Sequence, residues 1–348
     1  MLKNNKKFKI LYFTVGLTIA GIALYWVLRN FDLQTFLTIL EKADVKFLIL
    51  VPLSLMLQQG IRSWKWKHII SPLRAVSASR LFTAIMAGYF TNMIIPFAAS
   101  PLVRSWLVGK RYDLPMGTVL ATSAIERFID GLIFSLMVAF TLAFAALPDP
   151  DGNIRTSLML GSFGGGILFS GLIGLLLVLR RKQPRSHPLA SKLINKLPDK
   201  ISHAIYAFAR SFPAGIVWPR QPWRWVAIIT AGFLQKAAAA THFLWAGLAF
   251  GIVLAPLDYI YIVVLLGLLG FINHLLRIPG GYFIGNLYIL GLFGLSEEQS
   301  LALALTVHAS TLFVFIAVGG LSLWQNGVAL RDLKNVSRAS PANQEQIP

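Results

Sequence analysis

Long apolar runs alternate with short polar stretches along this chain of 348 residues. The long runs hold 16 to 30 residues. A helix of about 20 residues crosses a hydrocarbon layer of about 30 Å. The pattern predicts membrane helices over residues 8–28, 46–61, 117–146, 157–179, 225–253, 257–276 and 301–324. A short amphipathic segment is expected over 31–45. The sequence therefore predicts an all-α, polytopic integral membrane protein.

Two further apolar segments, 81–96 and 280–294, are shorter and are interrupted by proline or glycine. The chain before and after the first segment is predicted to lie on the same side of the membrane. The first segment is therefore predicted to enter the membrane and return as a re-entrant hairpin, broken near Pro96 and Pro101. The second is predicted to cross as a broken helix, which gives about eight crossings in all. Non-helical backbone at membrane depth is where transporters place substrate sites. Kinked helices that simply pack together are the alternative.

Composition and charge agree with a membrane protein and indicate its orientation. The chain is 56% hydrophobic and 13% charged, and its net charge is +18. Five basic residues and no acid lie in 62–80, and ten basic residues with one acid lie in 180–224. The positive-inside rule places both loops and the N-terminal residues 1–7 in the cytoplasm, so nucleic acid is not needed to explain the charge.

The predicted organisation is simple. Residues 8–324 form one transmembrane domain, and the polar tail 325–348 is expected to be disordered and cytoplasmic. We expect the protein in the cell inner membrane, with both termini inside. The chain has no cysteine, which excludes disulfides, thiolate catalysis and cysteine metal sites.

Three ionisable residues interrupt the long apolar run 117–146. Glu126 and Asp130 are four residues apart and share a helix face, and Arg127 is three residues from Asp130 and can pair with it. Each costs roughly 2.5–3.5 kcal/mol at a membrane helix centre, so this face is expected to point into the bundle or a wet cavity. Two interpretations fit this spacing: a structural ion pair and a polar substrate site.

Arg104 follows the first break, close to Asn92 and Ser100. A short helix that starts near Ser100 would present free N–H groups to an anion. Arg104 could then bind a phosphate or pair with Glu126. The alternative is a loop arginine that only follows the positive-inside rule.

The second break lies within 273–288, where Pro279, Gly280, Gly281 and Gly285 prevent a regular helix or allow close packing. A half-helix that begins after Gly281 would again aim N–H groups at the bundle centre, with Arg277 one turn before it. This predicts a second anion-binding pole. A kinked helix with an interfacial arginine is the alternative.

Enzyme signatures are missing from the sequence. It contains no H-E-x-x-H, no G-x-S-x-G and no P-loop, and its six histidines show no metal spacing. The short basic loop 180–224 does not fit a catalytic domain. We therefore expect a protein that is not an enzyme and needs no cofactor or metal.

The motifs together resemble the flippase-like membrane family that includes the transmembrane region of lysylphosphatidylglycerol synthases. The resemblance rests on Asn92, Pro96 and Arg104, on "ERFID" at 126–130, and on "PGG…G" at 279–285. It covers about residues 8–325 and implies a stand-alone member without the aminoacyl-transferase domain. The chain departs from the family at Ser100-Pro101 and at Asn286-Leu287, where members often carry a carboxylate.

The resemblance implies a lipid transporter that moves a headgroup through a polar groove while the tails stay in lipid. The implied partner is an anionic phospholipid, a hopanoid or a polyprenyl-phosphate-linked lipid. A separate lipid-modifying enzyme or further copies of the chain are also left open as partners. The alternatives are a partner subunit of a lipid-modifying pathway and an intramembrane enzyme. The predicted substrate-binding residues are Asn92, Arg104, Glu126, Arg127, Asp130, Arg277, Gly280 and Gly281.

Overall fold

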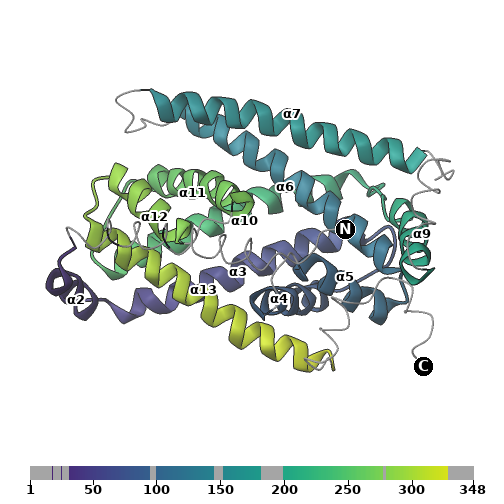
Figure 1. Ribbon diagram of the computed structural model, residues 1–348, viewed down its shortest axis with the longest axis horizontal. Coiled ribbons are helices and arrows are strands. Elements are labelled where there is room, and N and C mark those ends of the chain that lie inside the picture. The colour runs from purple at the N-terminus through teal and green to yellow at the C-terminus, as the bar shows by residue number, and fades with distance from the viewer. Residues whose placement is uncertain are drawn as a thin grey trace. The chain divides into compact units, whose positions relative to one another are not determined.

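A computed structural model describes residues 18, 25, 31–94, 99–144, 152–181, 199–276 and 280–327. Every regular element within these residues is an α-helix, which confirms the predicted all-α class (Figure 1). The helices are α2 (Leu33–Glu41), α3 (Val45–Ile70), α4 (Ala78–Ile94), α5 (Ala99–Tyr112), α6 (Met116–Phe144), α7 (Asn153–Arg181), α9 (Asp199–Ala214), α10 (Pro222–Ala249), α11 (Pro256–Leu276), α12 (Gly281–Leu292) and α13 (Glu297–Gln325). The helix expected over 8–28 lies outside the described residues, apart from Thr18 and Tyr25.

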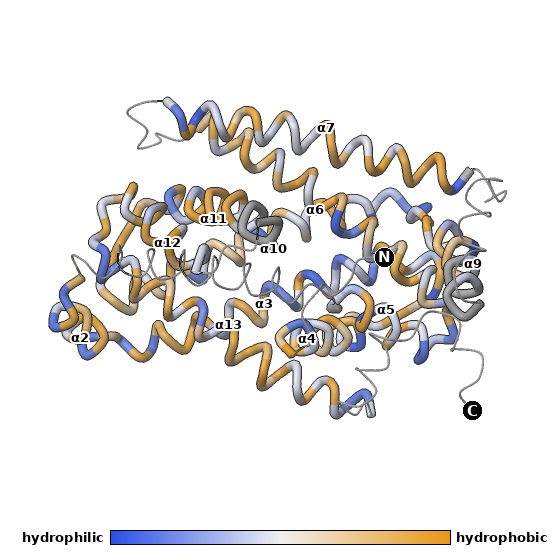
Figure 2. Tube along the Cα trace, viewed as in Figure 1, coloured by the Kyte–Doolittle hydropathy of each residue, from blue (hydrophilic) through white to orange (hydrophobic). Residues whose placement is uncertain are grey.

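Four of these helices, α3, α6, α7 and α13, are long and apolar enough to cross a membrane. The most apolar stretch of α7 is only 6% buried. Along it Leu160, Phe163 and Ile167 are each more than 70% exposed, and Figure 2 shows α7 as mainly hydrophobic. An apolar face of this extent suits lipid rather than water. The protein is an integral membrane protein, whereas eight crossings and a re-entrant element stay predictions.

The chain divides into two compact units. The first unit comprises residues 1–54, 138–159 and 236–311, and the second comprises 55–137, 160–235 and 312–348. Five helices, α3, α6, α7, α10 and α13, contribute residues to both units. Each unit has its own apolar core, so each is described separately below.

The first unit packs α11, α12 and parts of α3, α10 and α13 around an apolar core that includes Val51, Tyr259 and Leu290. A short helix, α2, starts where Asp32 caps it: the amide of Gln34 donates to Asp32 Oδ1 at 2.9 Å. Hydrogen bonds from the side chain and the amide of Thr35, and then from the amide of Gln34, lower the pKa of the Asp32 carboxyl. The amphipathic segment expected over 31–45 is therefore a capped helix.

The second predicted break is present in the first unit. The regular helix α11 ends at Leu276, and α12 begins at Gly281 after Gly280, which has a φ of 72°. Glycine adopts this left-handed conformation at no steric cost. A Cβ added at Gly285 would lie 2.6 Å from Leu269 Cδ2, so this glycine allows α12 to pack closely against α11.

In the second unit, α4 ends at Ile94, α5 begins at Ala99, and the two helices pack together as a helical hairpin. Residues 95–98, where the first break is predicted, lie outside the described residues. A Cβ added at Gly88 on α4 would lie 2.8 Å from the carbonyl oxygen of Ser100 on α5. Pro96 lies outside the described residues, and Pro101 does not interrupt the helix α5. Pro101 sits in the first turn of α5, where its missing N–H needs no partner.

Two stretches that the sequence assigned to basic loops contain helix. The helix α3 continues to Ile70, so residues 62–70 are not part of a loop, and α9 occupies 199–214 within the expected loop 180–224. The extension of α3 buries Trp66, Ile69 and Ile70 in the core of the second unit. Apolar packing on one face therefore holds this charged stretch in a helix.

Candidate functional site

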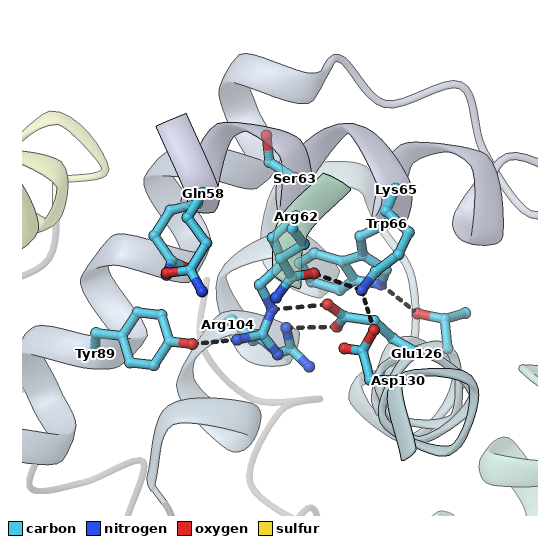
Figure 3. Close-up of polar contacts among 12 residues, drawn as sticks. Gln58, Arg62, Ser63, Lys65, Trp66, Tyr89, Arg104, Glu126 and Asp130 are labelled. Carbon is cyan, nitrogen blue, oxygen red and sulfur yellow. Dashed lines mark hydrogen bonds and ion pairs between the residues drawn. The ribbon is translucent and has the colours of Figure 1, made fainter. Parts of the chain in front are cut away.

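A cluster of buried charges lies inside the second unit, where side chains from α3, α5 and α6 meet (Figure 3). Arg62 Nε lies 2.7 Å from Glu126 Oε1, and Arg104 Nη1 lies 2.8 Å from Glu126 Oε2. Lys65 Nζ pairs with Asp130 Oδ1. We call these five residues the charge cluster.

Helical spacing brings the charges of α3 and α6 into register. Arg62 and Lys65 are three residues apart on α3, and Glu126 and Asp130 are four residues apart on α6, so each pair shares one helix face. When the two faces meet, the first cation meets the first carboxylate and the second meets the second. The side chains of Lys65 and Glu126 are 0% exposed, so both pairs depend on this register.

Neutral polar groups complete the shell of the charge cluster. Lys65 Nζ also donates to Gln235 Oε1 on α10 at 2.7 Å. The guanidinium of Arg62 donates to the hydroxyl of Tyr89 on α4 (Figure 3). Trp66 Nε1 donates to Thr122 Oγ1 at 3.0 Å. The first two bonds fix the cations of α3 from α10 and α4, and the third joins α3 to α6 through Trp66.

Arg104 is the member of the cluster with donors to spare. It is 2% exposed, and its guanidinium carbon lies 4.7 Å from the ring centroid of Trp66. Its Nε and Nη2 have no hydrogen-bond partner among the residues that the structure describes. An unsatisfied buried donor costs about 1–3 kcal/mol, and more when it is charged. The cluster therefore holds two charged donors without an acceptor among the described residues.

The charge cluster is positive as a whole. Three cations (Arg62, Lys65 and Arg104) meet two carboxylates (Glu126 and Asp130), which leaves a net charge of 3 − 2 = +1. A buried unpaired cation carries a desolvation cost of several kcal/mol. The arrangement therefore favours an anion as a sixth component.

The structure places the residues predicted for this region in different surroundings. Glu126 and Asp130 face the unit's interior, as expected, and Arg104 pairs with Glu126. Arg127 is exposed and forms no ion pair with Asp130, which instead pairs with Lys65, so that predicted pairing was wrong. Asn92 is exposed on α4. Substrate binding by any of these residues stays a prediction.

The residues predicted for the second break belong to the first unit. Gly280 is the left-handed residue before α12, and Gly281 is the buried first residue of that helix. Arg277 lies outside the described residues. Within α12, Asn286 is fully buried, and its Nδ2 donates to the Tyr282 carbonyl at 2.8 Å. The second anion-binding pole stays a prediction.

Two members of the cluster, Arg62 and Lys65, were missed by sequence reasoning because they were assigned to a basic loop. The signal that could have found them is their spacing. They precede Ile69 and Ile70 by one to two turns. A separation of three residues, like the four residues between Glu126 and Asp130, places both side chains on one helix face.

Comparisons with known proteins agree with the resemblance noted in the sequence. A family model described as the lysylphosphatidylglycerol synthase TM region matches residues 13–319. A curated relative, a UPF0104 membrane protein of Methanocaldococcus jannaschii, is 25% identical over 141 residues. That alignment covers 40% of this chain and 42% of the relative, so it spans less than half of either protein. No solved structure matches the chain.

Proposed function

Because the chain belongs to the lysylphosphatidylglycerol synthase transmembrane-region family, we propose that it transports an anionic lipid. In this proposal the charge cluster binds the phosphate of a phospholipid or polyprenyl-phosphate headgroup. The headgroup crosses the inner membrane through a polar groove while its tails stay in lipid. The chain performs no covalent chemistry in this mechanism.

The observation that carries the proposal is the pair of unused donors on Arg104. A guanidinium presents parallel N–H groups that match two phosphate oxygens, and such charge-assisted bonds are about twice as strong as neutral ones. In Arg104 one nitrogen faces Glu126, and two others, Nε and Nη2, have no hydrogen-bond partner among the described residues. A phosphate on these nitrogens would also balance the net positive charge of the cluster.

The carboxylates have a separate role in this mechanism. Glu126 holds both Arg62 and Arg104, so the guanidinium groups are oriented before a ligand arrives. A preorganised polar site replaces part of the water that a charged headgroup loses in the hydrocarbon layer. The sequence has no P-loop, so we propose downhill movement or coupling to an ion.

Lipid movement in proteoliposomes tests this function. Fluorescent phosphatidylglycerol and phosphatidylcholine would be followed by loss of fluorescence on adding dithionite, which reaches only the outer leaflet. The Arg104→Lys variant keeps the charge beside Glu126 but loses the planar fork, so we expect phosphatidylglycerol movement to fall about tenfold. The control, Arg111→Gln, changes an exposed arginine on the same helix and is expected to leave movement within about twofold.

Each outcome has a clear meaning. Selective loss in Arg104→Lys, with unchanged melting temperature, supports transport through the cluster. If well-folded wild-type protein moves neither lipid, nor a polyprenyl-phosphate lipid tested in the same way, the transport proposal is overturned. A chemical product formed from the lipid by the protein in detergent, where no two sides exist, would favour an enzyme instead.

A further inference from the structure

A second basic site lies in the second unit, at the end of α3. It is a pocket of about 450 Å³ whose lining includes Ser71, Gln221 and three arginines, Arg180, Arg220 and Arg224. None of the residues that line it is acidic, and none belongs to the charge cluster. No arginine of the pocket takes part in an ion pair within the described part of the chain. Three guanidinium groups around one cavity create a strongly positive potential there.

Trp218 gives this pocket a free donor in addition to its charge. Its indole Nε1 is buried and has no acceptor within the described ranges of the chain. The ring stacks on Trp225 with centroids 5.5 Å apart, and Trp225 Nε1 donates to the Pro219 carbonyl at 3.1 Å. The indole N–H of Trp225 therefore has a hydrogen-bond acceptor, whereas that of Trp218 has none among the described residues. The unpaired Nε1 of Trp218 costs about 1–3 kcal/mol, which an acceptor that reaches it would remove.

Arg224 is held in a fixed position beside the pocket. Its Nε donates to Gln221 Oε1 at 2.6 Å, and its guanidinium carbon lies 5.0 Å from the ring centroid of Trp223. Both contacts leave the terminal nitrogens free of bonds to the residues that the structure describes. The helix α10 begins at Pro222, directly after Gln221, and its N-terminus adds partial positive charge. The site is thus built to hold oxygen atoms of an anion.

The surrounding aromatic residues indicate the depth of this pocket in the membrane. Trp64 is 39% exposed and Trp223 is 54% exposed, and the ring of His68 lies between them at 4.7 and 5.1 Å. Exposed tryptophans beside basic residues are typical of the headgroup level of a bilayer. Basic pockets at this level are in reach of anionic lipid headgroups.

We propose that this pocket binds the phosphate of an anionic lipid headgroup at the membrane–water interface. The pocket is distinct from the charge cluster, but α3 connects them: Ile70, where α3 ends, lies about 7.5 Å along the axis from Lys65. A headgroup held in the pocket would therefore lie close to the cluster. This relation to transport rests on the proposed function, whereas binding in the pocket does not.

Calorimetric titration of the full chain in a non-ionic detergent tests the proposal, with short-chain dihexanoyl phosphatidylglycerol as the probe. The double variant Arg180→Gln/Arg220→Gln removes two pocket charges that form no ion pair among the described residues. We expect it to bind about tenfold more weakly than wild type, because charge-assisted bonds are lost. The matched control Arg80→Gln/Arg111→Gln removes two exposed charges that do not line the pocket and should bind within about twofold of wild type.

Two further titrations make the test specific. Trp218→Phe keeps an aromatic ring but removes the unpaired donor, and it should weaken binding without lowering the melting temperature. The same titrations in the Arg104→Lys background separate the pocket from the charge cluster. Binding that persists there and still depends on Arg180 and Arg220 supports the pocket even if the transport experiment fails.

Three results would overturn the proposal. Equal weakening in the pocket variant and the control variant would mean that only overall charge attracts the lipid. Equally tight binding of dihexanoyl phosphatidylcholine would show that the pocket does not select anionic headgroups. Inorganic phosphate that binds as tightly as the lipid would assign the pocket to a soluble anion.

Discussion

The two units of this protein each contain a broken helical pair, but they treat polar groups differently. In the second unit, α5 holds a buried arginine, Arg104, that pairs with Glu126 from α6. In the first unit, α12 holds a buried asparagine, Asn286, whose side-chain amide donates to a carbonyl of the same helix. The buried charges of the second unit have partners from several helices. The buried asparagine of the first unit is neutral, so a bond within its own helix is enough to stabilise it.

This contrast assigns different work to the two units. The second unit has net positive charge inside and a basic pocket at one end, so it has the chemistry to bind phosphate. The core of the first unit holds no ion pair among its described residues. Substitutions of buried polar groups should therefore have large effects in the second unit and small effects in the first.

The largest effect on stability is expected at Glu126, because its carboxylate balances the charges of two arginines. Glu126→Gln leaves Arg62 and Arg104 without a negative partner, and breaking a buried pair costs about 3–5 kcal/mol. We expect a large drop in melting temperature, measured in detergent by intrinsic fluorescence. The control Glu297→Gln removes an exposed carboxylate and should change stability by less than about 0.5 kcal/mol. Equal effects of the two substitutions would remove the contrast between the units.

The next effect concerns the pair of Lys65 and Asp130. Asp130→Asn leaves the fully buried ammonium of Lys65 with only Gln235, and it should cost about 3 kcal/mol. The double variant Lys65→Met/Asp130→Leu removes both charges and should recover most of that loss, because apolar residues can replace a buried pair. A double-mutant cycle from thermal unfolding measures the coupling. Additive losses would show that the two residues do not interact.

A smaller effect is expected where α4 and α5 meet. A Cβ at Gly88 would lie 2.8 Å from the Ser100 carbonyl oxygen, so Gly88→Ala should destabilise the hairpin by about 1–3 kcal/mol. Gly60 on α3 has no atom within 4 Å of an added Cβ. Gly60→Ala should instead stabilise by up to about 1 kcal/mol through helix propensity. Melting temperatures of the two variants should therefore move in opposite directions.

The smallest effect is expected at Asn286 in the first unit. Asn286→Leu removes one bond to a helix carbonyl and one buried oxygen without a described partner, so the two contributions largely cancel. We expect a change in stability within about 1 kcal/mol and little change in lipid movement. A loss of transport as large as that of Arg104→Lys would show that the first unit also recognises the headgroup.

Much of the fold could be predicted from the sequence. The expected helices at 117–146, 225–253 and 257–276 match α6, α10 and α11 within a few residues. Apolar periodicity and length determine such helices locally. The glycines at 280 and 281 likewise determine the break before α12. The family was also identifiable, because its motifs are short stretches of adjacent residues.

The sequence by itself also determined that Glu126 and Asp130 share a buried face, since four residues separate them on a helix. Only the tertiary structure decided which cations they meet. Arg127 is adjacent to Glu126 in the sequence yet is exposed, whereas Arg62 and Lys65 are more than 60 residues away and form the pairs. Spacing along a helix fixes which side chains share a face, but a buried charge is stabilised by whichever partners the packing of other helices brings near it.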